Sequence, residues 1–361
     1  MIQAAPETRM PDWSRVRKVL LVRLRSIGDT ILMTPCLAAL KSWRPDIEIT
    51  VLSEPLAAPV LDGHPLVDNL VISEKSLSSR ARLVGRLRRE RFDVAFNMHG
   101  GSTAAIIARL SGAPCTVGYK DYRSAWMLTA RAPAPDLILG RTRLHSVEQQ
   151  LALIHWSGMP WPRLRPQLSL AESKEAEASV REKLKQAVGL SDNFAIIAPA
   201  AAFESKRWTA EGFASVADHL SERWNLPSVI IAGPGQEHLA EEVSARARSR
   251  ACVLAGLSLK ELIALIGLAR VFVGNDGGPM HIAAAAGRPI ASVFGSSNAN
   301  VWHPWTGSPY KIIKSVEQTE RRKDTNVAST SEESEFAIRL IPVAEVIAAV
   351  DEVLEMAPAA G

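Results

Sequence analysis

Short apolar runs typical of buried strands alternate with amphipathic patterns typical of helices along most of the chain. In the first half this alternation predicts strands at 19–24, 47–52, 67–72 and 94–97, and helices at 30–43 and 80–91. In the second half it predicts strands at 195–198, 228–232, 270–273 and 290–294, a helix from about 209, a small-residue helix at 279–286 and a last helix at 343–356. The alternation is that of an α/β fold, with parallel sheets covered by helices on both faces.

A proline-rich stretch, 158–166, separates the two series of strands. Its prolines are Pro160, Pro162 and Pro166, which make it stiff and unsuited to regular structure. We therefore expect two Rossmann-like halves with a boundary between 160 and 172, and a ligand cleft between them at the carboxyl ends of the strands. The polar, charged segment 316–334 is interpreted as a mobile loop.

Composition narrows the class of protein further. The chain has 361 residues, enough for two domains, and 47% of them are hydrophobic, which supports a core in each. A net charge of +4 is too small to indicate a nucleic-acid partner. The three distant cysteines, Cys36, Cys115 and Cys252, argue against a disulfide framework and a structural zinc site. With neither a signal-peptide pattern nor a bilayer-spanning apolar run, we expect a cytoplasmic protein.

The stretch Gly274–His281 joins a predicted strand directly to the small-residue helix. Gly277 and Gly278 let a phosphate approach the unpaired N–H groups of the first helical turn, and Pro279 suits a position that needs no donor. Asp276 would accept hydrogen bonds from hydroxyl or amino groups attached to that phosphate. Together these residues indicate a sugar nucleotide, with an ordinary tight turn as the alternative.

A second turn, Arg25–Thr30, leaves the first strand at the place where doubly wound folds bind ligands. It contains Ser26 and only one glycine, Gly28, and therefore lacks the dinucleotide fingerprint. Asp29 is either the N-cap of the following helix or a carboxylate that takes a proton from an acceptor hydroxyl.

Two further loops carry charged residues after predicted strands. Lys206 and Arg207 precede a helix N-terminus, where an anionic ligand explains them better than structure does, although a solvated surface pair is the alternative. Glu237 follows Gly233–Gln236 and is either an acceptor for ribose hydroxyls or a first-turn helix carboxylate.

The predicted helix at 80–91 carries the one dense basic cluster of the sequence. Its arginines spread around most of the helix and either form a solvated face or contact a phosphorylated acceptor or an anionic membrane surface, with Arg86, Arg88 and Arg89 as the candidate contacts. His99, after the fourth predicted strand, either lines the acceptor side or is structural.

These motifs resemble those of glycosyltransferase family 9, the ADP-heptose:lipopolysaccharide heptosyltransferases. The resemblance lies in 18–35 and 274–284, with matching segments at 206–208 and 232–237, and it covers nearly the whole chain after residue 17. It implies a GT-B fold with an extension at 1–17, an acceptor-binding domain at 18–165, a donor-binding domain at 166–340 and a final helix at 341–361 that packs back toward the first domain.

The resemblance also implies a role for each motif in an inverting, metal-independent transfer of heptose, with no cofactor. Asp29 would be the general base, and Lys206 would face the phosphates and sugar of ADP-heptose. Glu237 would contact the ribose, and Asp276 the heptose hydroxyls. The turn around Gly277, Gly278, Pro279 and His281 would hold the diphosphate. We expect Arg25, Ser26, Gly28 and His99 on the acceptor side, with a phosphorylated glycolipid as the acceptor and peripheral contact with the inner membrane surface as a further possibility.

Two other classes of protein compete with this interpretation. A nucleotide-sugar epimerase shares the two-Rossmann design, but the Ile27–Asp29 turn argues against it. A non-enzymatic binder of nucleic acid or membrane would use the arginine helix alone, and the presence of both Asp29 and Lys206 argues against it. The 17 N-terminal residues have no obvious counterpart in the family, and many relatives carry cysteines or a more apolar run where this chain has 316–334. The sequence therefore leaves the acceptor undefined, and a related transferase with another sugar donor or acceptor remains open.

Overall fold

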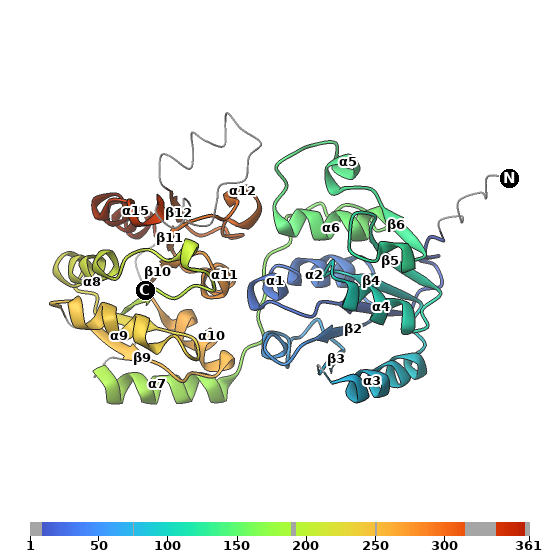
Figure 1. The fold of residues 1–361 in the computed structure, drawn as a ribbon, viewed down its shortest axis with the longest axis horizontal. Helices are drawn as coiled ribbons and strands as arrows, with labels where there is room; N and C mark the ends of the chain where they lie inside the picture. The colour runs from blue at the N-terminus through green and yellow to red at the C-terminus, as the bar shows by residue number, and fades with distance from the viewer. Residues whose placement is uncertain (1–8, 75, 189–192, 250, 315–336, 358–361) are drawn as a thin grey trace. The chain divides into compact units, whose positions relative to one another are not determined.

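The computed structural model describes residues 9–74, 76–188, 193–249, 251–314 and 337–357, and the expected loop at 316–334 lies outside these ranges. The chain forms two compact units, Met1–Ala171 and Glu172–Gly361, which are described separately (Figure 1).

The first unit is built on a parallel sheet whose strand order is β3-β2-β1-β4-β5-β6. Its strands are β1 (Lys18–Val22), β2 (Glu48–Ser53), β3 (Asn69–Ile72), β4 (Val94–Asn97), β5 (Cys115–Tyr119) and β6 (Ala130–Ala132). This is the order of the Rossmann fold, and the order reverses between β1 and β4. In the register of that pair Val22 lies opposite Asn97, so the two strands end at the same level.

Helices of the first unit connect these strands. They are α1 (Ile27–Ile31), α2 (Thr34–Trp43), η1 (Ala58–Val60), α3 (Leu77–Glu90), α4 (Ser102–Leu110), η2 (Ala125–Met127), α5 (Pro135–Leu139) and α6 (Ser146–Trp156). Alternate side chains of β1, including Leu20 and Val22, pack on α3 and α4 in one buried cluster. Side chains alternate between the faces of a strand, so Val19 and Leu21 fill the opposite face.

The second unit repeats the same topology in its own sheet, ordered β12-β11-β10-β7-β8-β9. Its strands are β7 (Ala195–Ala198), β8 (Ser228–Ile231), β9 (Ala251–Leu254), β10 (Val271–Asn275), β11 (Ile290–Val293) and β12 (Tyr310–Ile313). Its helices are α7 (Lys174–Val188), η3 (Glu204–Lys206), α8 (Ala210–Trp224), α9 (Glu237–Arg246), α10 (Leu259–Leu268), α11 (Gly278–Ala285), α12 (Ala299–Trp302) and α15 (Val343–Met356). Here β7 and β10 meet at the reversal, with Ala198 opposite Gly274.

The single helix expected at 30–43 is wrong, because the structure divides it into α1 and α2. Pro35 is the cause: it has no N–H to donate to the carbonyl of Ile31 four residues earlier. The hydroxyl of Thr34 donates to that carbonyl instead, at 2.7 Å. The chain therefore ends one short helix at the candidate site and starts a second one beyond it.

The final helix, α15, is fastened to the second unit. It packs on α8, β11 and β12, and Asp351 accepts hydrogen bonds from His219 and Trp224, each at 2.7 Å. Trp208 reaches the segment before this helix by donating to the carbonyl of Ile341 at 3.1 Å. Packing of the helix toward the first unit stays a prediction.

Candidate functional site

Polar side chains of the first unit gather where β1 and β4 end. The turn after β1 carries Arg23, Ser26 and Asp29, and the turn after β4 carries His99 and Gly100. Because these neighbouring strands end level with each other at the reversal of strand order, both turns lie at the position where doubly wound sheets bind ligands.

The carboxylate of Asp29 is held through one oxygen only. Arg23 contacts Oδ2 at 2.7 Å, and the Ser26 hydroxyl donates to the same oxygen at 3.0 Å. Within the described part of the chain nothing donates to Oδ1, and the side chain is 24% exposed. Ser26, rather than Asp29, caps α1, so the N-cap alternative for Asp29 is wrong. The free oxygen is a proton acceptor with a fixed orientation.

Arg23 is a site residue that the sequence pattern did not single out. Its side chain is 8% exposed, and it also donates to the carbonyl of Met98, so one buried cation joins the turns after β1 and β4. The signal was an arginine inside an otherwise apolar run, since a buried cation needs a partner. That partner is Asp29.

The turn after β4 is fixed by Asn97 and Tyr122. Asn97 accepts hydrogen bonds from the N–H groups of His99 and Gly100 at 3.1 and 3.0 Å. Gly100 has a φ of +82°, and a Cβ there would lie 3.1 Å from the Tyr122 ring, so both conformation and space favour glycine. Burial, and then the positive charges of Arg23 and Arg25, lower the pKa of His99. His99 is therefore a neutral lining residue at pH 7, not a cation.

A basic pocket of about 340 Å³ opens beside this turn. Its lining residues are Leu24, Arg25, Glu54, Arg80, His99, Gly101, Ser102, Thr103 and Arg123. The N-terminus of α4 also faces it, with Gly101 as an N-cap that supplies no side-chain hydrogen bond. The Nε atom of Arg80 is buried without a hydrogen-bond partner among the described residues. Three guanidinium groups and a helix N-terminus suit an anion.

The structure therefore brings one end of the arginine-rich helix to the site. Arg80 is in the first half of α3, whereas Arg86, Arg88 and Arg89 are exposed and do not line the pocket. The eight steps along the helix from residue 80 to residue 88 span about 12 Å. Contact of those three arginines with the acceptor stays a prediction, and Arg80 is the stronger candidate.

We predict that Arg80→Gln raises the KM for an anionic acceptor about tenfold, because a pocket cation is lost. This effect should persist at high salt, since partly buried charges are weakly screened. The triple variant Arg86→Gln, Arg88→Gln, Arg89→Gln serves as the matched comparison, and its smaller effect should disappear as salt is added. Acceptor kinetics at low and high salt make the measurement. An unchanged KM for Arg80→Gln would exclude this pocket as the acceptor site.

In the second unit, Lys206 and Asp276 lie at the corresponding position, where β7 and β10 end. Lys206 follows β7 and Asp276 follows β10, and their side chains form an ion pair of 2.9 Å. The Ser297 hydroxyl donates to the same Asp276 oxygen, Oδ2. The carboxylate is 5% exposed and the lysine 25%. A buried carboxylate is thus neutralised by a cation that still reaches the surface.

The first turn of α11 lies directly beside this ion pair in the sequence. Gly277 is its N-cap without a side-chain hydrogen bond, Pro279 stands at its start, and His281 is buried within it. The N–H groups of Gly277 and Gly278 find no acceptor in the part of the chain that the structure describes. Unpaired N–H groups at the start of an eight-residue helix are suited to an anion.

The other two residues of this unit that the sequence singled out, Glu237 and Arg207, form hydrogen bonds within the unit. Glu237 is the first residue of α9, and hydrogen bonds from backbone N–H groups, its own and that of Gly235, lower its pKa. Arg207 donates to the carbonyl of Ala201 at 3.0 Å. Glu237 is thus a first-turn helix carboxylate, and its contact with a ribose stays a prediction.

Gly295 allows the loop with Lys206 to lie against the end of β11. A Cβ at this position would lie 2.0 Å from the carbonyl oxygen of Ser205 and 3.0 Å from the Cα of Lys206. We predict that Gly295→Ala displaces Lys206, weakens at least tenfold the binding of the ADP that the family resemblance leads us to expect, and costs about 1–3 kcal/mol of stability. Gly267→Ala in α10, with nothing within 4 Å, is the matched control and should leave both unchanged or raise stability. Calorimetry of ADP binding and thermal unfolding test this, and parent-like binding by Gly295→Ala would contradict it.

Solved structures share this fold over nearly the whole chain. The glycosyl transferase family 9 protein from Veillonella parvula has a TM-score of 0.80 at 22% identity, covering 94% of this chain and 98% of its own. The E. coli ADP-heptose lps heptosyltransferase II has a TM-score of 0.76 at 21% identity, again covering 94% and 98%. Two Rossmann-type units of this kind define the GT-B architecture of glycosyltransferases.

The chain belongs to glycosyltransferase family 9 (heptosyltransferase), whose family model matches residues 80–331. Among curated proteins, lipopolysaccharide heptosyltransferase 3 from Escherichia coli is 28% identical over 351 residues, covering 92% of this chain and 97% of the relative. The protein is therefore a glycosyltransferase, and the alternatives of an epimerase and a non-enzymatic binder are not supported.

Among the described residues, no group of three or more His, Cys, Asp or Glu side chains is arranged to hold a metal ion. No helix in this part of the chain has the length and apolar character needed to cross a bilayer.

Proposed function

We propose that this protein transfers a heptose from ADP-heptose to a hydroxyl of a lipopolysaccharide inner-core acceptor, with inversion and without a metal ion. The observation that carries the proposal is the Asp29 carboxylate, which has one oxygen fixed and the other free at the ligand-binding end of the sheet. The names of two proteins it resembles, lipopolysaccharide heptosyltransferase 3 and ADP-heptose lps heptosyltransferase II, support the donor and the acceptor class.

Asp29 acts as the general base in this mechanism. The acceptor oxygen attacks the anomeric carbon of the heptose as the bond from that carbon to the diphosphate breaks. The acceptor proton passes to Oδ1, and the electron pair of the broken bond leaves with ADP. Arg23 and Ser26 occupy Oδ2 throughout, so the basic oxygen keeps its direction. A single displacement of this kind inverts the anomeric configuration.

The second unit supplies the charge that the departing ADP requires. We assign the diphosphate to the N–H groups of Gly277 and Gly278 and to Lys206, which are fixed donors for the developing negative charge. Lys206 then exchanges part of its contact with Asp276 for the phosphate oxygens. Asp276 Oδ1, which has no hydrogen bond among the described residues, accepts from heptose hydroxyls, and Glu237 contacts the ribose. A protein cation and helix amides take the place that a metal ion has in other transferases.

The acceptor is a phosphorylated glycolipid in this proposal, and the pocket of Arg25, Arg80 and Arg123 holds its anionic group. The enzyme then works in the cytoplasm, against the inner face of the membrane that carries the glycolipid. Arg86, Arg88 and Arg89 are exposed and add positive charge for that approach.

Incubation with ADP-heptose and a heptose-deficient core acceptor, followed by mass spectrometry, tests the proposal. The expected product gains one heptose, NMR shows inversion at the anomeric carbon, and the rate survives EDTA. Retention, or a strict need for Mg²⁺ or Mn²⁺, would contradict the mechanism. Transfer from a different nucleotide sugar, or to an acceptor other than lipopolysaccharide, would establish a glycosyltransferase of the same fold with another substrate.

A further inference from the structure

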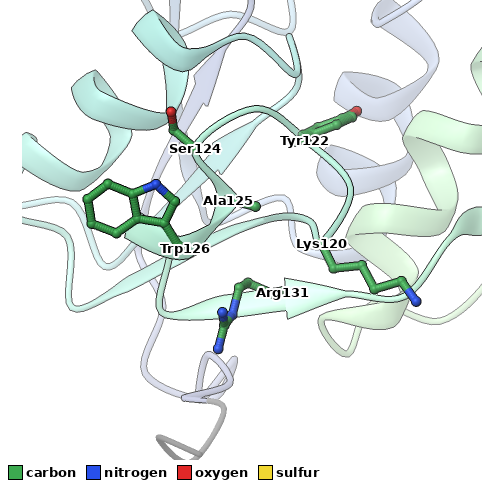
Figure 2. Close-up of a pocket in the computed structure, with 6 residues that line it drawn as sticks. All are labelled: Lys120, Tyr122, Ser124, Ala125, Trp126 and Arg131. Atoms are coloured by element: carbon green, nitrogen blue, oxygen red, sulfur yellow. The ribbon is translucent and has the colours of Figure 1, made fainter.

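A second pocket of the first unit, about 460 Å³ in volume, lies outside the residues already assigned to catalysis (Figure 2). Its lining residues are Lys120, Tyr122, Ser124, Ala125, Trp126 and Arg131. All come from the short segment between the end of β5 and the middle of β6, a segment that includes η2. In the view of Figure 2 the side chain of Arg131 lies between the indole of Trp126 and the ammonium group of Lys120.

Trp126 leaves its indole in solvent. Its exposed fraction is 76%, whereas the other eight tryptophans of the chain, all within the described residues, are buried or half-buried. An exposed aromatic ring contributes little to the stability of the fold, and aromatic side chains are enriched at binding surfaces. A flat, exposed indole in a hollow is suited to the C–H face of a sugar ring.

The backbone holds this indole in a fixed place. Met127 donates to the carbonyl of Ser124 at 3.1 Å and Leu128 to that of Ala125 at 2.9 Å, and Ala125 and Leu128 are both buried. Ser124 has a φ of +61°, an uncommon conformation for a residue with a side chain. The exposure of Trp126 is thus built into a well-anchored turn.

The charged groups of the pocket are all positive. Lys120 and Arg131 are exposed, and neither side chain forms an ion pair or hydrogen bond within the described part of the chain. No acidic residue lines the pocket. Two uncompensated cations beside an aromatic ring complement a ring that carries a negative group, such as a sugar with a phosphate or a carboxylate.

The same loop connects this pocket to the basic pocket near Asp29. Arg123 lines the basic pocket, and the next residue, Ser124, lines the pocket that contains Trp126. The Arg123 N–H donates to the carbonyl of Gly100 at 3.1 Å, and the Tyr122 ring covers Gly100, so the loop is fastened to the turn after β4. A branched or extended acceptor whose reacting hydroxyl lies at Asp29 therefore has a second point of contact one loop away.

We propose that the Trp126 pocket binds an anionic sugar of the acceptor, remote from the reacting hydroxyl, with the ring on the indole and the phosphate or carboxylate on Lys120 and Arg131. This inference rests on the proposed function for the identity of the acceptor as a glycan. It assigns the pocket a part in acceptor selection rather than in chemistry.

A binding experiment without donor tests the site directly. The protein carries 5-fluorotryptophan, the Trp126 resonance is assigned with Trp126→Phe, and the probe is the phosphorylated core oligosaccharide from deacylated lipopolysaccharide. The Trp126 ¹⁹F resonance should shift with saturation. If the anion is a phosphate, the dephosphorylated oligosaccharide should bind about tenfold more weakly, and if it is a carboxylate, carboxyl reduction should have that effect instead. A Trp126 resonance that stays in place while the oligosaccharide binds, or that responds only to phosphatidylglycerol vesicles, would overturn the proposal.

Steady-state kinetics supply the second readout. Trp126→Ala and Arg131→Gln should each raise the KM of the intact oligosaccharide about tenfold, with kcat within about twofold, because the lost contacts are remote from the reacting atoms. An acceptor cut back to the reacting sugar should show no difference. Arg163→Gln and Leu164→Ala, exposed on the same unit outside the pocket, are the matched controls. Parent-like KM values for both pocket variants would contradict the site. A ¹⁹F shift without heptose transfer would instead retain the site and reject the proposed reaction.

Discussion

We expect Asp29→Asn to lower kcat by about 10²-fold or more, while the affinity for ADP stays within a few-fold of that of the parent. Asparagine keeps the shape of the side chain but cannot take the acceptor proton. The ADP affinity is retained because the proposed diphosphate contacts belong to the other unit, at Lys206 and α11. Steady-state kinetics at saturating acceptor, with ADP binding by calorimetry, make the measurement.

Two further variants distinguish a base from a structural carboxylate. Ser26→Ala removes one hydrogen bond to Oδ2 but leaves the ion pair with Arg23, so it should lower kcat far less. Asp136→Asn on α5, an exposed carboxylate of the same unit, should change nothing. An Asp29→Asn enzyme with parental kcat would end the assignment.

The sequence located most of the central strands because their apolar runs are buried on both faces. Eight strands, β1, β2, β3, β4, β7, β8, β10 and β11, fall within a residue or two of the predicted ranges. Strands β5, β6, β9 and β12 were missed. β6 has only three residues with an arginine at its centre, and β12 is interrupted by a lysine. β9 is a four-residue apolar run whose residues are all only half-buried.

The candidate site was predictable wherever a motif sits on a strand-to-helix turn, as at Asp29 and Asp276. It was not predictable where the decisive fact is a partner far along the chain. Arg23 belongs to the site through the carbonyl of Met98, 75 residues later. The sequence did not distinguish Arg80 from the other arginines of its helix, whereas the structure shows that it lines the same pocket as Arg123. Trp126 had no local signal, because exposure follows from tertiary structure.

Lys206→Ala should weaken ADP binding about 10- to 100-fold and lower kcat as well, because in the proposed mechanism one cation contacts the diphosphate both when it is bound and when it leaves. The substitution also removes the cation from Asp276, and a 5% exposed carboxylate left with the Ser297 hydroxyl but no positive charge destabilises the unit. A loss of ADP binding by this variant alone could therefore reflect local unfolding, and the Lys206→Met, Asp276→Asn double variant separates the two causes by removing both charges.

We expect substitutions at the two residues of the ion pair to have different effects on the affinity for ADP. Asp276→Asn frees Lys206 from its competitor, so the affinity for ADP should stay the same or rise, while the preference for ADP-heptose over ADP is lost with the proposed acceptor of heptose hydroxyls. The double variant should bind ADP as weakly as Lys206→Ala, yet unfold near the parental temperature. Calorimetry with ADP and ADP-heptose in EDTA, together with thermal unfolding, should be carried out on all three variants. If Lys206→Ala binds ADP like the parent, the pair is structural and the diphosphate must be held by α11 without it.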